Sequence, residues 1–134
     1  MRGKTILVAE DDSSIRELVR ARLQISGYDV VTARTGAEAV SRVRTFTVDG
    51  LILDINMPEV DGFGVLRAIR ETPSIRRLPV LMLAARHAHD DVRRAVMLGA
   101  RDYLTKPFSE QQLIARVARL LKPRFEPPPG HGAI

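Results

Sequence analysis

Four charged residues in this sequence are of types that could do chemistry together. Each follows a short apolar segment typical of a strand, and they are Glu10, Asp11, Asp54 and Lys106. Carboxylates forced together are costly unless a cation neutralises them, and two carboxylates with a backbone carbonyl and waters form a common Mg²⁺ environment. The pattern predicts a divalent-metal site, with Asp11 and Asp54 as direct ligands and Glu10 bound through water.

The lysine suggests what such a metal site would do. A Mg²⁺ ion beside a lysine neutralises the oxygens of a phosphoryl group in transfer, and a carboxylate can serve as the nucleophile that becomes an aspartyl phosphate. Asp54 ends a buried strand and is the best placed to attack. Taken singly, loop aspartates are more commonly helix caps or turn residues. Their convergence at one sheet edge favours a phosphoryl-transfer site.

Five apolar segments and five amphipathic segments alternate along the chain and must position these residues. The predicted strands span residues 5–9, 28–33, 48–53, 78–83 and 102–104. Capping boxes at Thr35–Glu38 and Ser109–Gln112 open the second and fifth helices. The apolar pattern of the second helix places Phe46 on its core face, and that of the fourth helix includes Val96.

This alternation predicts an α/β fold, a parallel (βα)5 sheet covered by helices on both faces with right-handed crossovers. In such doubly wound sheets the ligand site lies beyond the carboxyl ends of the strands. Residues 1–122 are predicted to form one domain. Residues 123–134 are rich in proline and glycine and are predicted to be a tail or linker, with a stand-alone protein favoured.

Composition narrows the function further. The chain has 134 residues, no cysteine and a net charge of +5. Without cysteine, a metal must be held by oxygen or histidine. The sequence has no apolar run of the roughly 18 residues that a membrane span needs, so we expect a soluble, cytoplasmic protein. The arginines are scattered and aromatics are only 4% of the chain, so direct nucleic-acid binding is not expected.

Three motifs carry a resemblance to a known family. "ILVAEDD", "LILDINMPEVDG" and "GARDYLTKPF" resemble the receiver domain of two-component response regulators, in family order and spacing, over residues 4 to about 121. The resemblance implies a CheY-like, flavodoxin-like fold with strand order 2-1-3-4-5. It also implies a non-enzymatic signalling domain that a sensor histidine kinase or histidine phosphotransfer protein phosphorylates and that acts on a downstream protein effector.

The resemblance also implies roles for individual residues. Asp54 matches the phosphoacceptor and Lys106 the phosphate-contacting lysine. Glu10 and Asp11 match the acidic pair that, with Asp54, holds Mg²⁺ or Mn²⁺, and Asn56 matches the position that gives the metal a backbone carbonyl.

Further positions concern signalling after phosphorylation. Tyr103 matches the switch aromatic, whereas Ala84 stands where the family has a threonine or serine that bonds the phosphoryl group. We expect Tyr103 to rearrange weakly as a result. Asn56 and Arg86 match positions that influence dephosphorylation. The partner expectations include a weak or phosphorylation-dependent dimer.

Three other functions compete with this interpretation. A pseudo-receiver would signal by protein contact without phosphorylation. A Mg²⁺-dependent phosphohydrolase of the haloacid-dehalogenase type needs an acid two residues after its nucleophile, a role that Asn56 does not fill. An FMN-binding flavodoxin needs a phosphate loop after the first strand, where Glu10, Asp11 and Asp12 would repel the phosphate.

Overall fold

Five parallel strands and five helices alternate along the part of the chain that the computed structural model describes, residues 3–85 and 87–123. The strands are β1 (Thr5–Ala9), β2 (Asp29–Ala33), β3 (Gly50–Asp54), β4 (Val80–Ala84) and β5 (Asp102–Thr105). The helices are α1 (Ser13–Ile25), α2 (Gly36–Thr45), α3 (Gly62–Arg70), α4 (His89–Met97) and α5 (Glu110–Leu120). The strand order β2-β1-β3-β4-β5 confirms the predicted α/β fold.

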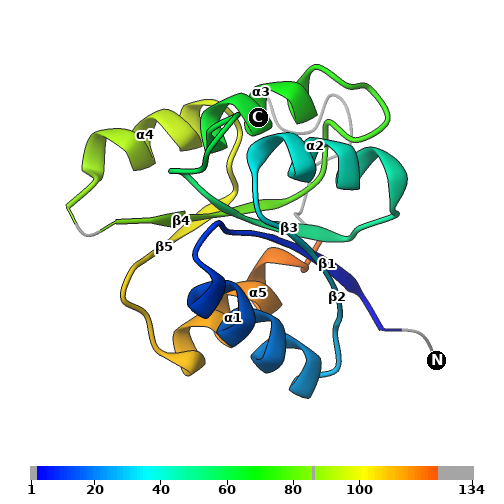
Figure 1. Cartoon of the computed structure of the whole chain (residues 1–134), viewed down its shortest axis with the longest axis vertical. Helices are drawn as coiled ribbons and strands as arrows, with labels where there is room; N and C mark the ends of the chain where they lie inside the picture. Colours follow the sequence, from blue (N-terminus) through cyan, green and yellow to red (C-terminus); the bar gives the residue numbers. More distant parts are fainter. Residues whose placement is uncertain (1–2, 86, 124–134) are drawn as a thin grey trace, which may run out of the picture.

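The sheet is covered on both faces (Figure 1). Helices α1 and α5 lie on one face, and α2, α3 and α4 lie on the other. Ile6 and Val8 of β1 belong to the core under α1 and α5, whereas Leu7 and Ala9 belong to the core on the opposite face. Successive strand residues thus face opposite sides, which explains why the strands are almost continuously apolar.

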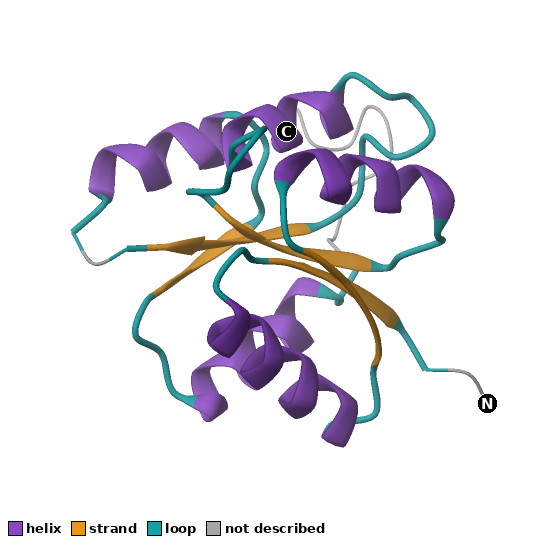
Figure 2. Cartoon of the chain, viewed as in Figure 1, coloured by secondary structure: helices purple, strands orange, loops and turns teal. Residues whose placement is uncertain are grey.

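Parallel pairing brings the carboxyl ends of the strands to one edge of the sheet (Figure 2). In the register, Ala9 lies opposite Leu53, Asp54 opposite Leu83, and Ala84 opposite Thr105. The residues that directly follow Ala9 and Thr105 are Glu10 and Lys106. The structure therefore brings Glu10, Asp54 and Lys106 together at this edge of the sheet.

The helices begin at the capping residues that their sequences provide. Asp12, Thr35, Asp61 and Ser109 each accept a hydrogen bond from a backbone N–H of the first helical turn. The capping box of α5 is complete, because the Gln112 side chain accepts from the Ser109 N–H. That of α2 is only half formed, since the Glu38 carboxylate accepts instead from the Arg34 N–H.

Three details of the prediction were wrong. Phe46 is not on the core face of α2: it is the C-cap residue and is 45% exposed. β3 begins at Gly50 rather than at residue 48. β4 begins at Val80 rather than at residue 78, because the Leu78 N–H is used in a turn that binds the Ile75 carbonyl.

No helix in the described residues is long and apolar enough to cross a membrane. Of the predicted tail, all but Pro123 lies outside the described residues.

Candidate functional site

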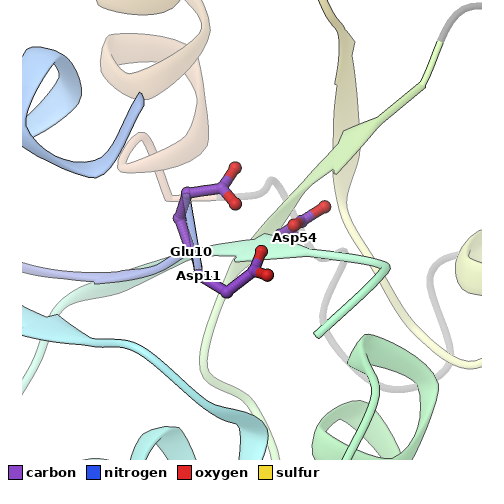
Figure 3. A group of neighbouring side chains, drawn as sticks. All are labelled: Glu10, Asp11 and Asp54. Atoms are coloured by element: carbon purple, nitrogen blue, oxygen red, sulfur yellow. The ribbon is translucent and has the colours of Figure 1, made fainter. Parts of the chain in front are cut away.

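Three carboxylates meet at the ends of β1 and β3 (Figure 3). Glu10 is 0% exposed and Asp54 is 4% exposed, whereas Asp11 lies at the surface. Each offers an oxygen atom, and these three oxygens lie within 4.8 Å of one another. The cluster therefore combines two buried acids with one that solvent can reach.

Lys106 supplies the positive charge of the site. Its Nζ atom lies 2.6 Å from Glu10 Oε1 and 3.4 Å from Asp54 Oδ1. Its backbone N–H donates to the Ala84 carbonyl at 2.7 Å, which fixes the loop after β5 against the end of β4. The Lys106–Pro107 peptide bond is cis. The sequence allowed either isomer, so the cis form is a finding of the structure.

The proximity of these groups changes their proton affinities. Burial, followed by the neighbouring Asp54 carboxyl, raises the pKa of Glu10 from 4.5 to about 7, although Lys106 acts in the opposite direction. Burial also disfavours the charge of Lys106, but the carboxylates of Glu10 and Asp54 outweigh it and raise the pKa of the lysine. The single ammonium of Lys106 therefore does not fully compensate for the burial of Glu10 beside a second carboxyl group.

The donor set suits a hard divalent cation. Carboxylate oxygens are the ligands that Mg²⁺ and Mn²⁺ prefer, and Glu10, Asp11 and Asp54 supply three of them. The Asn56 N–H donates to Asp54 Oδ1 at 3.3 Å, so the Asn56 backbone lies beside the same carboxylate. Burial, and after it the Asp54 carboxyl, raises the pKa of Glu10, and a bound cation would favour the ionised form of this carboxyl.

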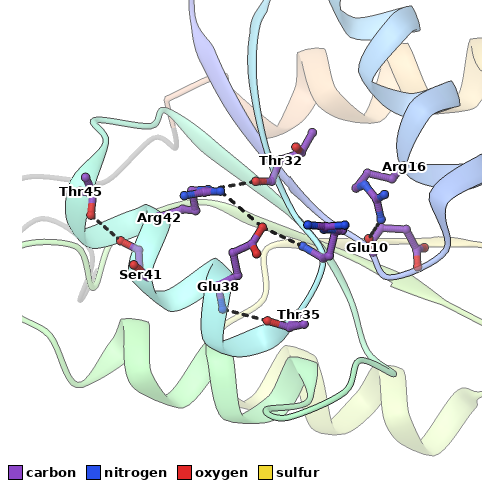
Figure 4. Close-up of polar contacts among 9 residues, drawn as sticks. Glu10, Arg16, Thr32, Thr35, Glu38, Ser41, Arg42 and Thr45 are labelled. Carbon is purple, nitrogen blue, oxygen red and sulfur yellow. Dashed lines mark hydrogen bonds and ion pairs between the residues drawn. The ribbon is translucent and has the colours of Figure 1, made fainter.

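Arg16 is a supporting residue that the sequence did not reveal. Its Nη1 atom donates to the backbone carbonyls of Glu10 at 2.9 Å and Asp11 at 3.3 Å, and Figure 4 shows the first of these contacts. The Asp12 N–H donates to Glu10 Oε2 at 3.2 Å. These bonds hold the acidic loop in shape. The only sequence signal was an arginine one turn into the helix that follows the loop.

Gly62 permits a close approach behind Asp54. A Cβ atom at this position would lie 2.6 Å from the Asp54 carbonyl oxygen and 2.8 Å from Ile55 Cα. The Gly62 N–H donates to the Ile55 carbonyl at 2.8 Å. Only glycine lets α3 begin directly against the backbone that presents Asp54.

A second polar network secures β2 to α2 (Figure 4). Arg42 of α2 donates to the Thr32 carbonyl at 3.2 Å and pairs with Glu38 at 3.5 Å. These contacts fix the strand next to β1 without reaching the acidic cluster.

The predicted switch positions lie on the neighbouring strands β4 and β5. Ala84 is buried at the end of β4, and its side chain has no polar atom to offer. Tyr103 of β5 is 42% exposed, and the Arg116 guanidinium lies 6.0 Å from its ring centroid. A pocket of about 250 Å³ beside the tyrosine is lined by Ala85, His87, Ala88, His89, Val92, Tyr103 and Thr105. Arg86 lies outside the described residues.

Comparison with known families defines the class of this protein. Residues 6–118 match the response regulator receiver domain, and the chain belongs to that family. Receiver domains are signalling domains, not enzymes, that bind Mg²⁺, accept a phosphoryl group and work with a cognate histidine kinase. The acidic cluster of Glu10, Asp11 and Asp54 is consistent with this class.

Individual relatives agree with the family assignment. The chain is 40% identical over 120 residues to the alkaline phosphatase synthesis transcriptional regulatory protein PhoP of Bacillus subtilis, covering 90% of this chain and 49% of PhoP. It is 40% identical over 117 residues to the response regulator MprA of Mycobacterium avium, covering 87% of this chain and 50% of MprA. The chain thus spans about half the length of these relatives.

Solved structures share the fold along nearly their whole length. A putative response regulator from Chloroflexus aurantiacus superposes with a TM-score of 0.86 at 34% identity, covering 90% of this chain and 98% of that one. The chemotaxis response regulator CheY4 of Vibrio cholerae gives a TM-score of 0.84 at 33% identity, covering 89% of this chain and 99% of that one.

Proposed function

We propose that Asp54 accepts a phosphoryl group from the phosphohistidine of a sensor kinase or phosphotransfer protein, in a reaction that requires Mg²⁺ or Mn²⁺. The observation that carries the proposal is the position of the Asp54 carboxylate. It is nearly buried at the end of β3, with Oδ1 3.4 Å from Lys106 Nζ. Glu10 is also buried and contacts Lys106, but its side chain is 0% exposed, whereas 6% of the Asp54 side chain is accessible to an incoming phosphoryl group.

The transfer is a substitution at phosphorus. An Asp54 carboxylate oxygen attacks the phosphorus atom, a carboxyl–phosphate bond forms, and the bond between phosphorus and the histidine nitrogen breaks. The electron pair of that bond stays on the imidazole, which takes up a proton. Lys106 provides positive charge beside the Asp54 carboxylate and the incoming phosphoryl oxygens.

Glu10, Asp11 and Asp54, with the backbone carbonyl of Asn56, would hold the cation. When bound, it neutralises charge on the phosphoryl oxygens during transfer. Arg16 keeps the Glu10–Asp11 backbone in the conformation that presents these oxygens.

The phosphodonor is proposed to dock on apolar residues that border the site. Ile15, Leu18 and Phe108 line a pocket of about 350 Å³ together with Ala85, Lys106 and Pro107. Leu18 is 46% exposed, although it belongs to the apolar pattern of α1. Because this pocket includes Lys106 itself, a protein segment seated on it would bring its histidine next to Asp54. Leu18→Ser should therefore slow transfer from a phosphorylated protein but leave phosphorylation by a small donor unchanged.

Ala84 is proposed to weaken the response that follows phosphorylation. Its methyl group offers no hydrogen bond to the phosphoryl group, and one such bond contributes about 0.5 to 1.5 kcal/mol. A two-state element shifts only by its differential contacts, so we expect Tyr103 to stay largely outside the pocket beside it. Tyr103 resonances with and without beryllofluoride, in the natural protein and in Ala84→Thr, test this. A full rearrangement in the natural protein would overturn it.

The chain is proposed to correspond to the phosphoacceptor half of longer regulators. The Bacillus subtilis relative is named a transcriptional regulatory protein, and this chain covers 49% of it.

Intact-mass measurement tests the function itself. The full chain is incubated with acetyl phosphate and Mg²⁺, and the expected result is a single phosphate adduct that is absent in Asp54→Asn. Asp29→Asn is the matched control, because Asp29 is exposed at the start of β2, on the opposite edge of the sheet. An adduct that persists in Asp54→Asn, or no adduct in the natural protein, would overturn the proposal.

A further inference from the structure

A second polar pocket lies at the edge of the sheet opposite to the acidic cluster. Its volume is about 500 Å³, and it is lined by Arg70, Arg76, Arg77, Leu78, Pro79, Gly99 and Arg101. These residues come from the end of α3, the segment before β4 and the segment before β5. Because all five strands are parallel, the starts of β4 and β5 lie far from the ends that carry the phosphorylation site.

We propose that this arginine pocket binds a small anion with adjacent phosphate groups, such as the pyrophosphate part of a nucleotide. The proposal does not depend on the function of Asp54. Four of the seven lining residues are arginines and none is a carboxylate. A concave surface with only one sign of charge concentrates ions of the opposite sign.

Arg70 is held in place before any ligand arrives. Its Nη1 atom donates to the carbonyls of Arg76 at 2.6 Å and Leu78 at 3.0 Å, and its Nη2 atom donates to the Gly99 carbonyl at 2.6 Å. Gly99 leaves room for this arrangement, because a Cβ atom there would lie 2.5 Å from Arg70 Nε. The guanidinium is therefore fixed by backbone carbonyls, which accept three of its hydrogen bonds without neutralising its charge.

Three of the four arginines of the pocket have no carboxylate partner among the described residues. Among the described residues, no carboxylate lies within ion-pair distance of Arg70, Arg76 or Arg77. Burial and the charge of Arg101 lower the pKa of Arg70, which shows that the guanidinium groups repel one another. An anion between them would remove this repulsion.

Phosphate groups fit this pocket better than other anions do. The planar guanidinium fork pairs with two phosphate oxygens at once. The volume lies in the range of small-molecule sites, and several arginines favour a ligand with more than one charge. None of the described residues that line the pocket is aromatic, so these residues offer a nucleotide base no stacking partner and recognition would rest on the phosphates.

The test is a titration of the full chain with inorganic pyrophosphate in the absence of divalent metal, followed by amide NMR signals. We expect saturable shifts centred on Leu78, Gly99 and Arg101. The double variant Arg76→Ala/Arg77→Ala should bind at least about tenfold more weakly, because a hydrogen bond to a charged group is typically worth that factor. Both side chains are exposed, and an unchanged thermal midpoint would show that the variant folds.

The matched control removes the same charge elsewhere. Arg34→Ala/Arg93→Ala takes two exposed arginines from other surfaces and should change the affinity less than about twofold, since distant surface charges are screened by salt. Three results would each overturn the proposal: no saturable binding by the natural protein, an equal loss in the control variant, or an affinity for single sulfate ions equal to that for pyrophosphate.

Discussion

The substitution Glu10→Gln tests whether burial or the ion pair with Lys106 dominates the energy of the acidic site. Glu10 is fully buried, and its pKa rises from 4.5 to about 7 although an ammonium lies 2.6 Å away. This rise corresponds to about 3 kcal/mol, because each tenfold change in proton affinity is worth about 1.4 kcal/mol. The folded state binds the Glu10 proton more tightly than the unfolded chain does. The resulting stabilisation is complete below pH 4.5 and is lost as the pH rises through about 7.

The neutral amide of Glu10→Gln should keep this stabilisation at every pH. Without metal, the variant and the natural protein should have similar unfolding free energies near pH 4.5, and the variant should be more stable by up to about 3 kcal/mol above pH 7. Urea unfolding in chelator at pH 4.5, 6 and 8 measures this difference. Glu71→Gln, at an exposed position after α3, should show no such trend. A Glu10→Gln protein less stable than the natural one at pH 8 would refute the reasoning.

Three further predictions concern the residues that support the site. Arg16→Met removes two hydrogen bonds to the Glu10 and Asp11 carbonyls and should lower the free energy of unfolding by about 1 to 3 kcal/mol. It should also weaken Mg²⁺ binding severalfold in a metal titration, and an unchanged metal affinity would count against the supporting role of Arg16. Gly62→Ala forces a methyl group onto the Asp54 backbone and should cost about 1 to 3 kcal/mol in urea unfolding. Gly64→Ala should cost less, because its methyl group meets only side-chain atoms, of Val60 and Asp61; the reverse order would contradict the packing. Ser109→Ala breaks the complete capping box of α5 and should lower stability by about 1 kcal/mol, a loss that Ser109→Asp should largely avoid in thermal unfolding.

The convergence of Glu10, Asp54 and Lys106 was predictable from the sequence. Each residue follows an apolar segment, and parallel strands bring such positions to one edge of the sheet. The strand order was implied by the family motifs rather than by the periodicity of the apolar residues. Burial was less predictable: Phe46 and Val96 fit helical patterns yet are half exposed, because periodicity does not show where a helix ends or which part of its apolar stripe is covered.

Contacts to backbone carbonyls could not be predicted. Arg16 binds carbonyls five and six residues earlier in the chain, and Arg70 binds one 29 residues later. Every residue carries a carbonyl, so no pattern of side-chain types marks such a partner. The arginine pocket could not be predicted either, because residues 70, 76–79 and 99–101 are brought together only by the folded sheet.

The most direct test of the central claim is to locate the phosphoryl group. After incubation with acetyl phosphate and Mg²⁺, borohydride reduction converts an aspartyl phosphate into homoserine, and peptide mass spectrometry identifies the converted residue. We expect homoserine at position 54 alone, with conversion abolished by chelator and strongly reduced in Lys106→Ala. Conversion at Asp11 or another acidic residue, or none at position 54 when Mg²⁺ is present, would contradict the account.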